Sequence, residues 1–479
     1  MALLSLILTT TALRLAFGTA VGLGVDESYM VASGRVLSLG YYDHPPIAWW
    51  LSWGAAHLFG SEAAVLVRLP FIALFAVSTW LMYWLGCAIA SERAGLWAAV
   101  LLNICPVFGV TTGTWVLPDG PLGCALLGAA LCLVNALERG TLAWWFGAGL
   151  CAGAALLSKY SAALTILGVF LYLLTSRQHR QLLATPKPWF AALIATLMFA
   201  PVLMWNARHG WTSFAFQAGR AEGFQFHPFG PLVTLSGEAL FVLPWIWLPM
   251  MAVLVVALRR GPDAWRSWLL SWLALPPIAV FAVISAWSSQ RVLFHWAAPG
   301  YLMLFPLLGD AVARLIERAA VRWTVAGTGA FVVLGMVIVA SQVRWGWLQP
   351  VIAEITPNDP TIQAVDWTSL GDGLPPDAMV GVPNWRDAGK IGYALGPDVT
   401  TVCLSLDCRQ FGLTSPAHRF IGVNFLIFVP EHADRVANEL ARAFDRVERL
   451  PDASIRQGRR TLQTVAVFRG DHLRAWPPQ

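Results

Sequence analysis

Apolar stretches long enough to cross a lipid bilayer recur along the first 342 of the 479 residues of this chain, and they restrict its fold more than any other feature. The hydrocarbon core of a bilayer is about 30 Å thick, and a helix of roughly 20 apolar residues spans it. With 57% hydrophobic and only 12% charged residues, the chain has too little polar surface for a water-soluble globule. We therefore expect a mostly α-helical, polytopic membrane protein of about eleven transmembrane helices. The spans are predicted at residues 3–22, 64–86, 95–114, 120–137, 142–157, 160–175, 188–206, 232–257, 268–286, 296–313 and 323–342.

The last part of the chain has a different composition. Residues 343–479 hold much of the Asp, Glu and Arg and no apolar run of spanning length. We therefore predict a membrane region over residues 1–342, followed by a small soluble α/β domain. The segments that indicate this domain are three short β-branched stretches at 378–383, 399–404 and 422–429, and a helical pattern at 431–446.

The basic residues set the orientation of the spans. Alternate connections between spans carry clusters of Arg or Lys, and the positive-inside rule assigns these connections to the cytoplasm. The other connections then face outward, and an odd number of spans makes the C-terminal domain extracytoplasmic as well. Topology also explains the net charge of +5, so we expect no nucleic-acid partner. The outward connections are residues 23–63, 115–119, 158–159, 207–231 and 287–295.

Two details of processing stay open in the sequence. Residues 1–22 are apolar and end in small residues, as a cleaved signal peptide does, but they lack a basic start and carry Arg14. We treat them as the first span. Cys403 and Cys408 flank a short polar turn in the predicted extracytoplasmic domain, where the alternatives are a disulfide and two free thiols.

The first outward connection carries two groups of candidate site residues. Asp26 and Glu27 directly follow the first span, and Tyr42, Asp43 and His44 precede a Trp-rich amphipathic stretch. An acidic pair at the edge of a bilayer is costly unless it binds or reacts with something. The structural alternative for Asp26 is a helix N-cap, in which its carboxylate accepts backbone N–H groups of a helix that begins near Glu27.

The next two outward connections add an acidic and a basic residue. Asp119 stands at the head of a span, where the alternative role is again that of a helix cap. Lys159 and Tyr160 occupy the third connection, on the side of the membrane that positive charge usually avoids. A lysine in this place indicates an anionic ligand, with snorkelling to lipid headgroups as the alternative.

Further basic and aromatic side chains occupy the last two outward connections. The candidates for substrate binding there are Arg208, His209, Arg220, Arg291 and His295. No His-x-x-His or similar spacing supports a metal site, so we assign no metal ligand and leave a divalent metal open as a cofactor. Carboxylates hydrogen-bond to sugars, aromatic faces stack on them, and Lys and Arg pair with phosphate. A sugar linked to a lipid phosphate therefore fits the whole set.

Six short motifs occur in a fixed order between the spans, at residues 26–27, 42–46, 118–122, 158–160, 205–211 and 295–299. Together they resemble the GT-C superfamily of membrane glycosyltransferases. Within it the resemblance is to glycosyltransferase family 39, with its lipid A aminoarabinose transferase-like relatives and the protein O-mannosyltransferases. This resemblance implies transfer of a sugar from a polyprenyl-phosphate donor, with inversion at the anomeric carbon, to an envelope lipid, glycan or protein. It also implies a bacterial inner membrane, with the site facing the periplasm.

The chemistry of such a transfer needs few groups. Phosphate is a good leaving group that requires charge stabilisation more than a proton, so one carboxylate acting as base on the acceptor suffices. Position in the motifs matches Asp26 to the base and Lys159 to the donor phosphate. The remaining roles that we assign are Arg220 or Arg291 as a second phosphate contact, and Glu27, Asp43 and Asp119 as sugar-positioning groups or supports for the base.

The chain departs from the family pattern at one place. Where aminoarabinose transferase-like proteins carry an acidic-Lys pair near a proline, this chain has Asp43 and His44. We therefore carry over neither an aminoarabinose donor nor a metal or phosphate contact from that position. Two other classes of function remain as alternatives, a transporter or flippase of polyprenyl-linked sugars and a non-catalytic lipid-sugar binding subunit.

Overall fold

The structure, a computed structural model, describes residues 1–219, 225–288, 291–356, 360–375, 378–458 and 460–477. It consists of two compact units, each assembled from segments that are distant in the sequence. The first unit contains residues 1–16, 44–48 and 69–336, and the second contains residues 17–43, 49–68 and 337–479. The second unit therefore combines most of the first predicted outward connection with the C-terminal part of the chain.

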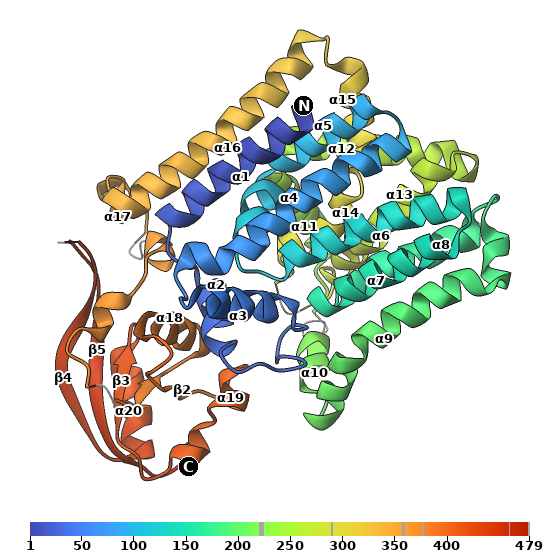
Figure 1. Ribbon diagram of the computed structural model, residues 1–479. Coiled ribbons are helices and arrows are strands. Elements are labelled where there is room, and N and C mark those ends of the chain that lie inside the picture. Colours follow the sequence, from blue (N-terminus) through green and yellow to red (C-terminus); the bar gives the residue numbers. More distant parts are fainter. Residues whose placement is uncertain (220–224, 289–290, 357–359, 376–377, 459, 478–479) are drawn as a thin grey trace. The chain divides into compact units, whose positions relative to one another are not determined.

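Apolar helices build the first unit, and α1, α4 and α16 continue into the second (Figure 1). The helices are α1 (Ala2–Ala20), α4 (Ala64–Ile89), α5 (Glu92–Ile104), α6 (Asp119–Arg139), α7 (Leu142–Ser158), α8 (Ala162–Thr175), α9 (Pro186–Arg208), α10 (Thr212–Gly219), α11 (Gly230–Val242), α12 (Pro244–Arg260), α13 (Trp265–Ile284), α14 (Ala298–Leu302), α15 (Phe305–Leu315) and α16 (Ala319–Trp345). Short helical turns of other types lie at η1 (Val107–Thr112), η2 (Arg180–Ala184), η3 (Gly261–Asp263) and η4 (Phe294–Ala297).

Several of these helices can cross a membrane. In the described part of the chain, six are long and apolar enough, namely α1, α4, α6, α9, α13 and α16. Two bent pairs, α11 with α12 and the η4–α14 segment with α15, raise the number to eight if each pair is one span. Helical segments overlap all the predicted spans, but these criteria give six to eight crossings. The chain is a multi-pass, mostly α-helical membrane protein.

The predicted span 232–257 is not a single straight helix. The chain turns by 115° between α11 and α12. Leu243, at the turn, has a φ of 85°, which is unusual for a residue with a side chain, and Pro244 has no N–H with which to continue α11. The segment around residues 296–313 is also bent, by 64°. Hydropathy measures how apolar a segment is and not its direction, so the sequence pattern missed both bends.

Glycines allow some helices of the first unit to approach closely. Helix α6 packs on α7, α7 on α9, and α8 on α13 (Figure 1). A Cβ atom on Gly168 of α8 would lie 2.2 Å from the backbone oxygen of Trp272, and one on Gly149 of α7 would lie 2.6 Å from that of Ala191. Such contacts of small residues with backbone are the usual way in which membrane helices pack.

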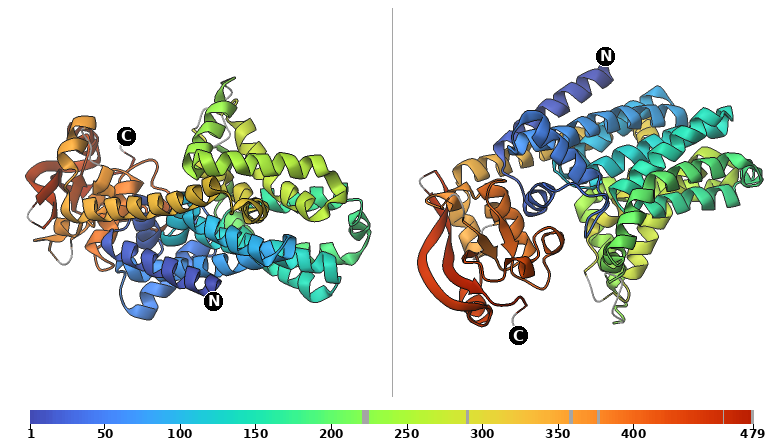
Figure 2. Two further views of the ribbon diagram at one scale, coloured as in Figure 1. Left: turned by 90° about the horizontal axis from the view of Figure 1, so that it is seen from above. Right: turned by 60° about the horizontal axis from the view of Figure 1, so that its bottom comes forward.

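A five-stranded mixed sheet forms the centre of the second unit, with strand order β2-β1-β3-β5-β4. Strand β1 is parallel to β2 and β3, whereas β5 is antiparallel to β3 and β4, and β4 and β5 form a long curved pair (Figure 2). The strands are β1 (Val380–Val382), β2 (Thr401–Cys403), β3 (Phe425–Val429), β4 (Phe444–Gln457) and β5 (Arg460–Leu473). The α/β character predicted for the C-terminal residues is confirmed, including the first three strands and the helix near 431–446.

Helices α2 and α18 pack against each other within the second unit. Helix α18 begins after Asn384, whose side chain accepts the N–H groups of Arg386 and Asp387. Gly389 of α18 lies so close to Tyr29 of α2 that a Cβ atom would be 2.8 Å from the Tyr29 nitrogen. The helices of this unit are α2 (Val25–Ser33), α3 (Ile47–Phe59), α17 (Gln349–Ile355), α18 (Trp385–Leu395), α19 (Phe411–Thr414) and α20 (Ala433–Ala443), with short turns η5 (Pro360–Ala364), η6 (Thr368–Gly371) and η7 (Ala417–Phe420).

Candidate functional site

In the first unit, Asp119 and Lys159 form an ion pair. The Lys159 ammonium donates to both carboxylate oxygens of Asp119, at 2.9 and 3.1 Å. The Lys159 side chain is 9% exposed and that of Asp119 is 16% exposed. Asp119 is the first residue of α6 and Pro118 is its N-cap, so Asp119 does not cap the helix. Lys159 is the C-cap of α7 and its ammonium group points to Asp119, which contradicts snorkelling to lipid. His44 and His295 interact electrostatically with the Asp119 carboxylate.

A cavity of about 250 Å³ adjoins this ion pair. Helices α8 and α13 supply aliphatic and aromatic walls, including Leu164 and Phe281. Polar groups line the rest of the cavity, and the Tyr160 hydroxyl lies 2.7 Å from the Ser213 hydroxyl. The cavity thus combines a cation with apolar surface, as a lipid phosphate requires. Its lining residues are His44, Lys159, Tyr160, Ser161, Ala163, Leu164, Gln217, Phe281, Ile284 and Trp296.

In the second unit, Asp26 and Glu27 have different surroundings although they are neighbours. Helix α2 begins at Val25 with Gly24 as its N-cap, so Asp26 lies in the first turn and its side chain is exposed rather than capping the helix. Glu27 is buried and accepts the Gly24 N–H at 2.9 Å. Its carboxylate also accepts two hydrogen bonds from the buried Arg68 guanidinium, at 2.8 and 2.5 Å. Glu27 therefore fixes the segment that carries Asp26.

The sequence analysis did not single out Arg68. Besides Glu27, its guanidinium donates to the carbonyl oxygens of Gly18, Val21 and Gly22, at 2.7 to 2.9 Å. Arg68 lies within the predicted span 64–86, and a charged residue inside an apolar span is itself a signal that a partner is present. That signal was in the sequence, but the partner was not.

Asp43 is buried and has partners from two parts of the chain. The Tyr29 hydroxyl donates to its Oδ1 at 3.1 Å, and Arg409 pairs with its Oδ2 at 3.2 Å. Burial raises the pKa of Asp43 above its ordinary value, while the charge of Arg409 opposes that shift and the charge of Asp26 adds to it. The Asp26 and Asp43 carboxylates therefore interact electrostatically. Arg409 belongs to the C-terminal residues, where the sequence offered no motif to mark it.

Three of the predicted binding residues are exposed in the first unit. Arg208 and His209 are exposed at the end of α9, where the His209 ring stacks on Trp205 with centroids 4.2 Å apart. Arg291 is exposed, with its guanidinium 5.4 Å from the centre of the Phe294 ring. Arg220 lies outside the described residues. The structure thus gathers His44, Asp119, Lys159, Tyr160 and His295 in one unit, and Asp26, Glu27, Tyr42 and Asp43 in the other.

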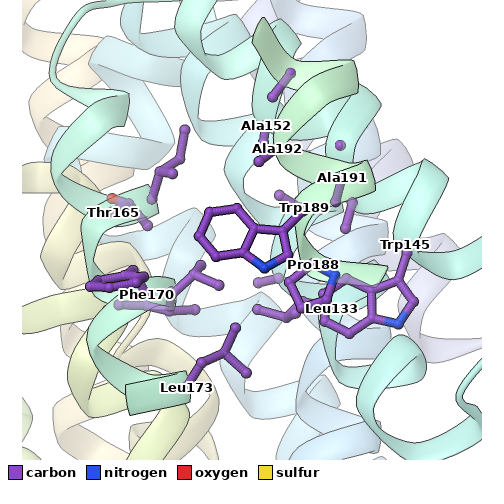
Figure 3. Close-up of a pocket in the computed structure, with 18 of the residues that line it drawn as sticks. Leu133, Trp145, Ala152, Thr165, Phe170, Leu173, Pro188, Trp189, Ala191 and Ala192 are labelled. Atoms are coloured by element: carbon purple, nitrogen blue, oxygen red, sulfur yellow. The ribbon is translucent and has the colours of Figure 1, made fainter. Parts of the chain in front are cut away.

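A second cavity of about 170 Å³ lies among α6, α7, α8, α9 and α13. Figure 3 shows its mainly apolar lining, with the rings of Trp145, Phe170 and Trp189 and the aliphatic side chains of Leu133 and Leu173. None of the residues predicted for the site lines it. This cavity suits a hydrocarbon chain and not a sugar.

One buried polar network of the first unit was missed by the sequence analysis. Glu238 of α11 accepts the Tyr301 hydroxyl, and the same hydroxyl accepts the indole N–H of Trp247 at 2.9 Å. Tyr301 follows the η4 segment that carries His295, so this network anchors α14 and the turn before it to α11. As with Arg68, an ionisable residue within an apolar span was the available signal.

The described residues also bear on the predictions about a metal site and about the two cysteines of the C-terminal residues. Within the described ranges, no group of three or more His, Cys, Asp or Glu side chains is arranged to hold a metal ion. The cysteine pair of the C-terminal residues is resolved in favour of a disulfide between Cys403 and Cys408. This disulfide closes the turn between β2 and α19.

The helical membrane bundle and the small mixed sheet form the fold seen in the solved structures of ArnT. The comparisons with known proteins identify the relatives. Residues 43–205 match the family model of dolichyl-phosphate-mannose-protein mannosyltransferases. The lipid A galacturonosyltransferase RgtD of Rhizobium johnstonii is 24% identical, and the match covers 58% of each chain.

Solved structures show the same fold over nearly the whole chain. ArnT from Cupriavidus metallidurans in the apo state superimposes with a TM-score of 0.63 at 12% identity, covering 97% of both chains. The structure of ArnT bound to undecaprenyl phosphate gives a TM-score of 0.61 at 16% identity, again with 97% of both chains covered. The relatives identified by sequence are glycosyltransferases, and these matches support the class inferred from the six motifs.

Proposed function

We propose that this protein is a glycosyltransferase that moves a sugar from a polyprenyl-phosphate donor, with inversion, to an envelope lipid, glycan or protein. The observation that carries the proposal is the Asp119–Lys159 ion pair beside a cavity with apolar walls. A lipid phosphate needs a cation for its charge and apolar surface for its chain. Two relatives add support, since one ArnT structure holds undecaprenyl phosphate and RgtD is named as a lipid A galacturonosyltransferase.

In the proposed reaction Asp26 is the general base. Its exposed carboxylate takes the proton of an acceptor hydroxyl, and the hydroxyl oxygen bonds to the anomeric carbon while the bond from that carbon to the phosphate oxygen breaks. Lys159 stabilises the negative charge of the departing polyprenyl phosphate. Because Asp119 neutralises Lys159, the donor phosphate competes with Asp119 for the ammonium group. Asp43, His44 and Tyr160 are assigned to the sugar and the phosphate.

The proposed topology has eleven crossings, with the site and the C-terminal residues in the periplasm of a bacterial inner membrane. Counting α5, α7 and α8 as crossings besides the six long helices and the two bent pairs gives this number. The positive-inside rule supports the orientation. The Cys403–Cys408 disulfide supports it further, since disulfides persist in oxidising compartments.

The test is to compare envelope glycolipids and glycans by mass spectrometry in a strain with and without this protein. We expect one sugar-sized mass to disappear with the protein and to return with the native chain. Purified protein in detergent, offered a panel of polyprenyl-phosphate sugars and the acceptor so identified, should then transfer the sugar. A flippase cannot act in detergent, because there is no bilayer with two leaflets. If the sugar-sized mass disappears from the strain without the protein but the purified protein transfers no sugar, the flippase or binding-subunit alternative is supported instead.

Replacing the donor-site lysine should weaken donor binding. A charge-assisted hydrogen bond contributes about 1.5–3 kcal/mol, so Lys159→Gln should raise the Kd for undecaprenyl phosphate by about tenfold to a hundredfold. Binding is measured with the purified protein by tryptophan fluorescence. Lys187→Gln is the matched control, because Lys187 donates to the Gly140 carbonyl elsewhere in the first unit. Equal affinity of the Lys159→Gln and Lys187→Gln variants would remove Lys159 from the phosphate site.

A further inference from the structure

Two residues next to the turn closed by the Cys403–Cys408 disulfide contact the segment that contains Asp43. Arg409 and Gln410 follow Cys408 directly, and Arg409 has a φ of 46°, a conformation uncommon for a residue with a side chain. The disulfide across residues 403–408 restricts the conformations of the backbone that leads into Arg409.

Arg409 is held on two sides. Its guanidinium carbon lies 3.6 Å from the centre of the Trp385 ring, and one of its nitrogens lies 3.2 Å from Asp43 Oδ2. The Arg409 side chain is 18% exposed and that of Asp43 is 4% exposed. A planar guanidinium stacked on an aromatic ring and paired with a carboxylate is a geometry that Lys does not reproduce.

Gln410 connects the same two segments through its backbone N–H and its side-chain oxygen. Its N–H donates to the Tyr29 hydroxyl at 3.1 Å, and its Oε1 accepts the N–H of Tyr42 at 3.0 Å. The Tyr29 hydroxyl donates in turn to Asp43 Oδ1. Both oxygens of Asp43 and the backbone beside it are thus fixed by the two residues that directly follow the disulfide-closed turn, either directly or through Tyr29.

The charge of Arg409 also affects the ionisation of Asp43. Burial raises the pKa of Asp43, the neighbouring carboxylate of Asp26 raises it further, and Arg409 lowers it. The Tyr29 hydroxyl lowers it as well by donating to the carboxylate. Around the nearby Tyr42, the charges of Asp407 and Arg409 act in opposite directions. Arg409 is thus the cation that opposes protonation of a buried carboxylate beside the proposed base.

We propose that Arg409 is a positioning residue for sugar transfer, which orients the Asp43 carboxylate, and that the Cys403–Cys408 disulfide is required for this role. The inference rests on the proposed function, because it assigns Arg409 to the site that contains Asp26. In this way the C-terminal residues contribute Arg409 to the proposed site in the first loop, which contains Asp26 and Asp43. Reduction of one disulfide lowers the activity of the enzyme.

The first test measures the pH profile of transfer by Arg409→Gln, Arg409→Lys and the control Arg419→Gln, which alters an exposed arginine. We expect Arg409→Gln to lower kcat/KM by about tenfold to a hundredfold, the loss of one charge-assisted contact. Because the pKa of Asp43 rises when the Arg409 charge is removed, the acidic limb of its profile should move to higher pH. Arg409→Lys keeps the charge, so its acidic limb should stay nearer to that of the native protein. An unmoved limb in Arg409→Gln overturns the positioning role.

The second test compares the native protein with the Cys403→Ser, Cys408→Ser double variant, each with and without dithiothreitol. Reduction should lower the native activity to the level of the double variant and leave the double variant unchanged. Five further cysteines, which are free thiols, are present in both proteins and serve as the internal control. A double variant as active as the native protein overturns the requirement for the disulfide.

A third measurement does not depend on activity. Hydrogen exchange at the Tyr42 amide, which donates to Gln410, should become faster on reduction of the full-length protein in detergent, while the amides of β3 keep their protection. Unchanged exchange at Tyr42 overturns the inference. If the native protein transfers no sugar but Tyr42 responds to reduction, the proposed function fails and the link between the two segments stands. If the native protein is active and Arg409→Gln matches it, the inference alone fails.

Discussion

We expect Asp26→Asn to abolish nearly all sugar transfer while leaving the protein folded. The exposed side chain makes this change compatible with the fold, and the amide cannot take a proton from an acceptor hydroxyl. A general base contributes about 10²–10⁴-fold to the rate, so kcat should fall by that factor. The measurement is the initial rate of transfer by purified protein, at donor and acceptor concentrations well above KM.

The control for this prediction is Asp398→Asn, which alters another exposed acidic residue of the second unit and should leave kcat unchanged. Donor binding to Asp26→Asn should remain close to native, because Lys159 and its cavity belong to the first unit. A rate within about threefold of the native value, with binding unchanged, would show that Asp26 is not the base, since a base contributes far more than that. In that case a strain complemented with Asp26→Asn also regains the missing sugar.

We expect Arg68→Met to destabilise the second unit strongly. The change removes two hydrogen bonds from the buried Glu27 carboxylate and leaves three carbonyl oxygens without their donor. Breaking a buried ion pair by removing one partner costs about 3–5 kcal/mol. We expect little folded protein after purification and a clear fall in the Tm of what remains, measured by differential scanning fluorimetry in detergent.

Two further variants separate the charge from the packing. Arg93→Met breaks an ion pair whose side chains are 68% and 85% exposed, and it should change the Tm little. Combining Arg68→Met with Glu27→Met removes the stranded carboxylate and should recover part of the lost stability. No recovery would show that the carbonyl contacts of Arg68 dominate over its pairing with Glu27.

The helices of the membrane region were predictable from hydropathy, because each apolar run can be recognised by itself. The bends between these helices were not predictable in this way. Each apolar run contributes its own hydropathy, so helical segments overlap every predicted span. The turn at Leu243 depends on one backbone conformation next to Pro244 and leaves no trace in a hydropathy average. Strands β1, β2 and β3 were found by their β-branched residues, but β4 and β5 carry many charged side chains and their pairing is with each other.

The sequence marked individual residues as candidates for the site, but it did not predict how they pair. Asp119 and Lys159 were marked separately as a support and a phosphate contact, because each is charged at the end of a span. Their ion pair joins residues 40 positions apart, which local patterns do not encode. Arg409 reaches Asp43 across 366 positions and has no motif of its own. The roles assigned to Asp26, Glu27 and Asp43 remain predictions for the experiments above.

The interlocking of α2 with the C-terminal residues has a consequence for biosynthesis. Lys390 of α18 is buried and donates to the Leu23 carbonyl at 2.7 Å, and the Gly22 N–H donates to the Ala364 carbonyl at 2.8 Å. Leu23 is synthesised and reaches the membrane long before Lys390 is synthesised. The first loop therefore lacks these hydrogen-bond partners while the intervening helices insert. Chains cut short before α18 would therefore insert their helices and still present an unfinished loop to quality-control proteases.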